Sequence, residues 1–124
     1  MFLIKIKIKG NLKNISEKTN DLIETYAIKN KNKITYHNND TIYKLTILDN
    51  EIILIRENEE FIHKFVFNID NITKSEYYIK ELRTTIDIPI KTNKLIIKEN
   101  NIIIEYIIID NDNEYSYILD MEWI

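Results

Sequence analysis

Apolar and polar residues alternate with a period of two along most of this chain. In the segment Phe2–Gly10, three isoleucines alternate with Lys5, Lys7 and Lys9. Successive side chains of a β-strand point to opposite faces, so this pattern sets the isoleucines on one face and the lysines on the other. The segment is therefore predicted to be a half-buried strand with a basic outer face.

The same alternation recurs, and clusters of Asn and Asp separate the repeats at intervals of about ten residues. The further predicted strands are Asp21–Lys29, Lys33–His37, Thr41–Leu48, Glu51–Glu57, Phe61–Phe67, Tyr77–Leu82, Thr84–Lys91, Lys94–Glu99, Asn101–Asp110 and Glu114–Ile124. Asn11–Asn20 is expected to be a polar connection, and Asn68–Glu76 is expected to hold one helical turn. Because no long segment has the period of an amphipathic helix, the pattern predicts an all-β chain.

Evenly spaced short strands are typical of a sandwich or an up-and-down barrel. A barrel is favoured here, because closure removes the edges that isoleucine-rich strands would otherwise expose to aggregation. We therefore expect one domain over residues 1–124, built as a single antiparallel barrel of about eight to ten strands.

Composition narrows the classes of function. The chain is 44% apolar and 30% charged, which is typical of a soluble globular protein. It contains no cysteine, as expected for a protein of the reducing cytoplasm. A net charge of -3 disfavours nucleic-acid binding. No apolar run approaches the roughly 20 residues of a spanning helix, and the early lysines interrupt any signal peptide, so no membrane partner is expected.

The motifs of common enzymes and metal proteins are missing from the sequence. A single glycine, Gly10, excludes phosphate-binding glycine loops and nucleophile elbows. His37 and His63 lack the spacing of a metal pair, and Asp110–Glu114 lacks the glycine that a calcium loop needs. We accordingly expect no catalytic residue, no metal and no cofactor.

Three cationic side chains are the candidate ligand-binding residues. Alternation places His63 on the face of the neighbouring phenylalanines and Arg56 on the face of Ile52 and Leu54. Inside a barrel, Arg56 could clamp a carboxylate, and Arg83 is the other arginine. The favoured alternative is that Arg56 and His63 lie at strand ends and point to solvent, because unpaired charges are rarely buried.

The last two predicted strands contain Glu105, a carboxylate among isoleucines. The odd positions of Glu114–Ile124 form an apolar row, so a two-residue turn directs Glu105 outward. The preferred turn, Asn111–Asp112, sets Glu105 opposite Ile118. A turn at Asp112–Asn113 would set it opposite Asp120, and a three-residue turn would bury it.

Outward-facing residues of this hairpin suggest two further hypotheses. The first is an apolar patch that could support a homodimer, and its members are Ile103, Ile107, Ile109 and Ile118. The chain uses isoleucine so heavily that a biased composition is the competing explanation. The second hypothesis, which is less favoured, is an enzyme that uses the carboxylates of Glu105, Asp120 and Glu122.

Several segments together resemble a known family. The segment Thr46–Phe67, the Tyr-rich stretch that follows it, "IDIPIKTNKL" and the closing hairpin "IIIEYIIIDNDNEYSYILDMEWI" look like the YwiB-like proteins. The resemblance implies a calycin-like (lipocalin-like) β-barrel of an uncharacterised bacterial family, with no established activity. We therefore expect a non-catalytic binding or interaction module. The alternative is a barrel whose lumen binds a small apolar or carboxylate-bearing ligand.

Overall fold

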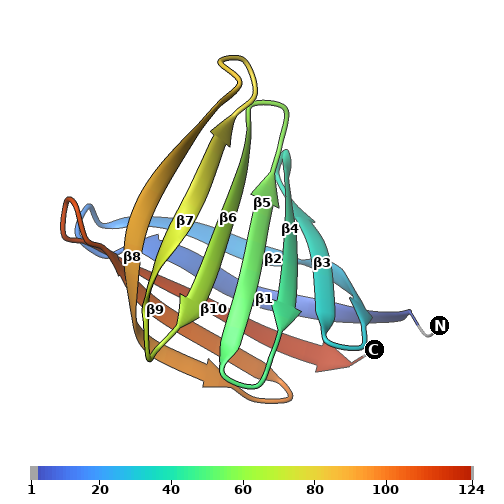
Figure 1. Cartoon of the computed structure of the whole chain (residues 1–124). Helices are drawn as coiled ribbons and strands as arrows, with labels where there is room; N and C mark the ends of the chain where they lie inside the picture. Colours follow the sequence, from blue (N-terminus) through green and yellow to red (C-terminus); the bar gives the residue numbers. More distant parts are fainter. Residues whose placement is uncertain (1–2, 124) are drawn as a thin grey trace.

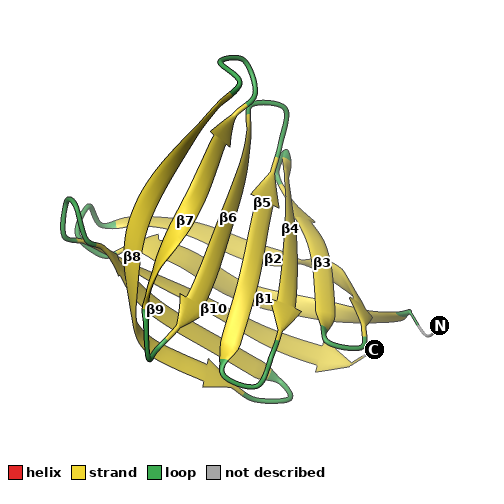
Figure 2. Ribbon diagram, viewed as in Figure 1, coloured by secondary structure: helices red, strands yellow, loops and turns green. Residues whose placement is uncertain are grey.

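The computed structural model describes residues 3–123, and it contains ten strands. Each strand pairs antiparallel with its neighbour in the chain, and β1 closes the barrel against β10 (Figures 1 and 2). The strands are β1 (Ile4–Asn14), β2 (Thr19–Asn30), β3 (Lys33–Asn38), β4 (Thr41–Ile47), β5 (Glu51–Glu57), β6 (Phe61–Asn68), β7 (Ile72–Ile79), β8 (Thr84–Ile97), β9 (Asn101–Ile108) and β10 (Asn113–Trp123). The prediction of an all-β, antiparallel barrel is confirmed.

Two groups of strands cross at a large angle. In Figure 1, β3–β7 stand upright, whereas β1, β2 and β10 run across behind them. The longest strand, β8, bends from one direction to the other, and its pairing with β9 shifts at a bulge between Thr92 and Lys94. A bulge adds one unpaired residue and bends a strand, which lets β8 pair with β7 on one side and with β9 on the other.

The expected polar connection Asn11–Asn20 is wrong, because strand pairing continues through most of it. β1 runs past Gly10 to Asn14, and only residues 15–18 form the turn to β2. Gly10 makes this possible, since a Cβ at that position would overlap the carbonyl oxygen of Ile118 on β10. Glycine therefore serves here to admit a neighbouring strand. The expected strand ends at Phe2 and Ile124 lie outside the described residues.

The helical turn expected in Asn68–Glu76 is also wrong. Residues 69–71 form a tight turn, in which the Asn68 side chain accepts a hydrogen bond from the Asp70 amide (2.9 Å), and β7 follows. The alternation of β7 is weak because its inward positions include the hydroxyl residues Thr73 and Ser75. Both hydroxyls donate to backbone carbonyls, Thr73 to Val66 and Ser75 to Ile88, so their hydrogen-bonding groups are satisfied on the inner face.

Aliphatic and aromatic side chains from strands all around the barrel form one buried cluster in its interior. Ile34, Leu45, Leu54 and Phe65 face one another in register across β3–β6 and are almost fully buried, as is Phe67 on the next row. We call these five residues the apolar layer. The rings of Phe65 and Phe67 also meet Tyr106 of the non-adjacent strand β9, with centroids 5.8 and 5.0 Å apart. These contacts show that side chains meet across the interior at the level of the apolar layer.

The β9–β10 hairpin has the predicted faces but a different register. Glu105 points outward, and it lies opposite Ser116 instead of Ile118 or Asp120. The connection is four residues long, 109–112, which keeps the parity of a two-residue turn but shifts the partners. In this register the Tyr106 and Tyr115 rings stack in the interior, with centroids 5.0 Å apart. Turn preferences alone do not predict this register, because the register also depends on how the side chains pack in the interior.

Candidate functional site

A single row of inward-facing residues crosses five neighbouring strands next to the apolar layer. Tyr36, Tyr43, Arg56, His63 and Tyr77 come from β3, β4, β5, β6 and β7 in turn, and each lies opposite the next in the strand pairing. We call these five residues the polar row. On β3–β6 the polar row lies two residues along the strand from Ile34, Leu45, Leu54 and Phe65, at the end of the barrel that carries the β3–β4, β5–β6 and β7–β8 turns.

Arg56 is the charged member of the polar row. Its guanidinium lies over two rings, with the carbon Cζ 5.5 Å from the Tyr43 centroid and 5.6 Å from that of Phe61. The side chain is half-buried, and its Nε has no hydrogen-bond partner among residues 3–123. No carboxylate of the described chain forms an ion pair with it. Cation–π contacts offset only part of the cost of removing a charge from water.

His63 lies directly opposite Arg56 and is held by its neighbours. Its ring packs on Phe65, with centroids 3.9 Å apart, and meets the edge of Tyr77. Its Nε2 lies 3.2 Å from the Ser75 hydroxyl, which itself lies 3.1 Å from the Ile88 carbonyl. Because Ser75 donates its one proton to that carbonyl, its oxygen accepts from His63 Nε2–H. The free lone pair of the neutral ring is therefore on Nδ1.

Burial and the Arg56 charge set the protonation state of His63. Desolvation first, and then repulsion by the guanidinium, lower the pKa of His63 to about 4. Both causes penalise the imidazolium, so the ring is neutral at physiological pH. Arg56 consequently has a polar but uncharged neighbour on β6.

Three buried tyrosines lie near enough to Arg56 for its charge to act on them. Tyr36 and Tyr117 share a hydrogen bond that joins β3 to β10 across the interior. Burial raises the pKa of Tyr36, Tyr106 and Tyr117 well above the usual tyrosine value, so all three stay protonated. The polar row therefore carries one positive charge at neutral pH, the charge of Arg56, beside several neutral hydrogen-bonding groups.

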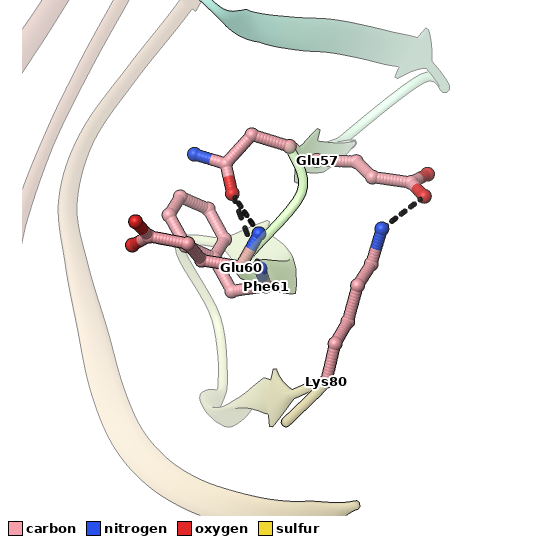
Figure 3. Close-up of polar contacts among 5 residues, drawn as sticks. Glu57, Glu60, Phe61 and Lys80 are labelled. Carbon is pink, nitrogen blue, oxygen red and sulfur yellow. Dashed lines mark hydrogen bonds and ion pairs between the residues drawn. The ribbon is translucent and has the colours of Figure 1, made fainter. Parts of the chain in front are cut away.

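Hydrogen bonds at the turns fix the end of the barrel next to Arg56. Figure 3 shows Lys80, which follows β7, reaching Glu57 at the end of β5, with a 3.1 Å ion pair. The Asn58 side chain accepts from the backbone amides of Glu60 and Phe61, and it donates to Thr41 at the start of β4. These contacts connect β4, β5, β6 and β7 at this end, so the backbone on either side of the β5–β6 turn is held in place.

The structure brings together two of the three candidate ligand-binding residues. Arg56 and His63 are near strand ends, as the solvent-facing alternative supposed, but both point inward and are half-buried. Arg83 is exposed in the β7–β8 turn at the same end, with a left-handed φ of 50°. The candidate residues predicted from the sequence did not include Tyr36, Tyr43 and Tyr77, although the alternation of their strands places all three on inner faces.

The four isoleucines of the proposed self-association patch are not all adjacent on the outer face. Ile103 and Ile118 are directly paired on the outer face, whereas Ile107 lies between Glu114 and Lys91 in the pairing. Of the four isoleucines, Ile103, Ile107 and Ile118 are half-buried and Ile109 is 37% exposed. Self-association stays a prediction, which sedimentation of the purified protein would test.

The proposed carboxylate cluster is spread along the hairpin. Asp120 lies four residues along β10 from Ser116, the partner of Glu105, which is roughly 13 Å at the usual strand rise. Asp120 instead accepts a 2.6 Å hydrogen bond from Asn101, and Glu122 lies opposite Lys7 of β1. This arrangement separates Glu105 from the other two carboxylates.

Clefts between described residues occur away from the polar row. One of about 410 Å³ lies beside the β1–β2 turn, and one of about 280 Å³ lies at the far end of the barrel beside Lys29, Ile47 and Lys98. Within residues 3–123, no group of three or more metal-ligating side chains is placed to hold an ion. Over the same residues, no helix is long and apolar enough to cross a membrane.

Comparisons with known proteins show a shared fold. No protein-family model matches the chain, and no curated protein is significantly similar to it. The crystal structure of the ywiB protein from Bacillus subtilis superimposes with a TM-score of 0.71 at 14% sequence identity. The match covers 98% of this chain and 91% of that one, so the two proteins share the fold over almost their whole length.

Proposed function

We propose that this barrel is a non-catalytic binding module that takes a small ligand with an anionic group beside Arg56. One observation carries the proposal: a half-buried guanidinium on the inner wall has no carboxylate partner in the described chain, and its Nε is buried without an acceptor. An unpaired, partly desolvated charge is costly. An anion that binds to it would recover that cost through charge-assisted hydrogen bonds.

The surroundings of Arg56 suit ligand binding better than catalysis. His63 offers Nδ1 as an acceptor, but its depressed pKa makes it a poor proton donor at neutral pH. Tyr36 and Tyr117 remain protonated and hydrogen-bond to each other, so they add no negative charge beside Arg56. Because the apolar layer fills the interior beneath, the ligand would rest on the polar row instead of lying deep in a lumen.

The proposal also covers the family of the protein and its location in the cell. The likeness to the ywiB protein over 98% of the chain supports assigning it to the YwiB-like family of calycin-like bacterial barrels. The absence of cysteine supports a cytoplasmic location. The acidic net charge of -3 supports a small molecule as the ligand in preference to nucleic acid.

Nuclear magnetic resonance of the arginine side chains tests the proposal. Acetate, benzoate and inorganic phosphate would be titrated while the Nε–Hε signal of Arg56 is followed. We expect at least one anion to shift this signal in a saturable manner, and Arg56→Gln to abolish the binding. Arg83→Gln is the matched control, because it removes an exposed arginine of the same barrel end. The proposal fails if no anion shifts the Arg56 signal.

A further inference from the structure

We infer that the ligand is a monocarboxylate with a short apolar body, and that it binds with its carboxylate pointing into the barrel. This inference rests on the proposed function. The class follows from three features: the number of charges beside Arg56, the depth to which the interior is filled, and the apolar surface left at the end of the barrel. Each feature restricts a different part of the ligand.

The charges select a monoanion. Arg56 is the charged member of the polar row, since burial keeps both His63 and Tyr36 neutral at physiological pH. At this end of the barrel, Lys80 is already paired with Glu57, and Arg83 is exposed in the β7–β8 turn, outside the inward-facing polar row. A dianion would leave its second charge unpaired in a half-buried place, which is costly. One carboxylate instead matches one planar guanidinium, which can bind it with two parallel hydrogen bonds.

The packing beneath the polar row sets the depth of the ligand. Leu54 and Phe65 lie two residues further in from Arg56 and His63 and are 3% exposed. Phe65 meets Tyr106 across the interior, so that level is occupied by side chains. A ligand that reaches Arg56 therefore stops there. Its charged group is at the inner end, and the rest of the molecule extends toward the turns.

Inward-facing apolar side chains line the path from Arg56 to the turns. Ile86 of β8 lies opposite Tyr77 in the pairing and is 45% exposed although it faces inward. Phe61 and Ile79, which pair with each other in the next row outward, are half-buried. β6 begins two residues before His63, and β7 ends two residues after Tyr77, so this part of the wall extends roughly 7 Å beyond the polar row. That length suits a single aromatic ring or a short alkyl chain.

A series of probes separates these features by calorimetric titration at neutral pH. Benzoate and hexanoate carry one charge and a short apolar body, benzamide lacks the charge, acetate lacks the body, and phthalate carries a second charge. Palmitate extends the alkyl body beyond the wall. We expect benzoate or hexanoate to bind at least tenfold more tightly than benzamide, acetate or phthalate, and palmitate to gain nothing over hexanoate.

Two variants test which residues bind the charge and the apolar body of the ligand. Arg56→Gln should remove the preference for benzoate over benzamide. Ile86→Thr should weaken benzoate several-fold and leave acetate unchanged. The matched control for the second change is Ile72→Thr, because Ile72 is 64% exposed on the outer face of the neighbouring strand. Circular dichroism would confirm that every variant is folded.

The outcomes separate this inference from the proposed function. If acetate, phthalate and phosphate bind at Arg56 as tightly as benzoate, the anion site stands and the monocarboxylate inference is wrong. If palmitate binds far more tightly than hexanoate, the short body is wrong. If none of the anions binds, both the site and the inference fail.

Discussion

Two adjacent layers of the barrel interior have opposite chemistry. The apolar layer contains hydrocarbon side chains, whereas the polar row contains a cation, an imidazole and three phenols on largely the same strands. A step of two residues separates Leu54 from Arg56 on β5 and Phe65 from His63 on β6. The strands and the backbone pairing are shared, so the difference comes from the side chains alone.

The contrast indicates that the two layers have different roles in the protein. Side chains of the apolar layer are at most 3% exposed, and burial of such surface is the main source of folding free energy. The polar row has features that stability alone would not select: a guanidinium without a carboxylate partner among residues 3–123, and a histidine kept neutral by burial and by that guanidinium. Strained electrostatics of this kind cluster at functional sites.

The largest effect is expected for truncation in the apolar layer. Phe67→Ala should lower the free energy of unfolding by about 3–5 kcal/mol, because it removes a fully buried ring that packs on Phe65 and Tyr106. Urea denaturation measures this. Val66→Ala, on the outer face of the same strand, should cost no more than about 1.5 kcal/mol. Equal losses for the two variants would mean that the interior is loosely packed.

The next effect is a loss of stability in acid that arises from His63. Its pKa in the folded protein is about 4, below the value of about 6.5 in an unfolded chain, so the unfolded chain takes up the proton first. This contribution is intact above pH 6.5 and falls by at most about 3 kcal/mol as the pH drops to 4. Urea denaturation across this range should show a shallower pH dependence for His63→Gln than for the wild type.

The exposed histidine provides the control for that measurement. His37 faces outward on β3, so His37→Gln should keep the pH dependence of the wild type. Carboxylates that titrate in the same range contribute equally to all three proteins and cancel in the comparison. If the His63→Gln and wild-type curves are parallel, the ring of His63 is charged or solvated in the folded protein.

A smaller effect concerns the hydrogen bond that joins the polar row to the opposite wall. Tyr36→Phe or Tyr117→Phe should each cost about 1–2 kcal/mol, because each leaves a buried hydroxyl without its partner. The double variant should cost no more than either single change, since both polar groups are then gone. Thermal unfolding of the four proteins gives the coupling energy, and strictly additive losses would contradict a direct interaction.

The smallest effect on stability is expected at the centre of the polar row. Arg56→Met should leave the free energy of unfolding unchanged or raise it by about 1 kcal/mol, since it replaces an unpaired charge by an apolar chain of similar length. Removal of the guanidinium should also raise the pKa of His63, which NMR titration of the ring would show. A loss above about 2 kcal/mol would mean that Arg56 supports the fold, and the contrast between the layers would disappear.

The fold was largely predictable because period-two alternation reports directly which face of each strand is buried. Segments such as Glu51–Glu57 were predicted with their final bounds, and the parity that directs Glu105 outward was correct. The prediction was wrong where the periodic signal is weak. β7 buries hydroxyls in place of hydrocarbon, and β1 passes through the one glycine of the chain.

The candidate site was predictable only in part. Alternation placed Arg56 and His63 on inner faces, but the low frequency of unpaired buried charges favoured the opposite conclusion, that they point to solvent. Whether two residues on neighbouring strands meet depends on register, and register depends on packing that involves the whole barrel. The same limit explains why the partner of Glu105 was wrong although its face was right.

The sequence by itself therefore determined the strands, their faces and the all-β class, because these follow from local alternation. The tertiary structure decided which side chains meet. Pairing in register aligned five residues from five strands into the polar row and brought Tyr117 of β10 to Tyr36 of β3, 81 positions apart in the chain. Closure of the barrel also removed Arg56 from most of the solvent. Such contacts join segments far apart in sequence, so no local pattern of residues encodes them.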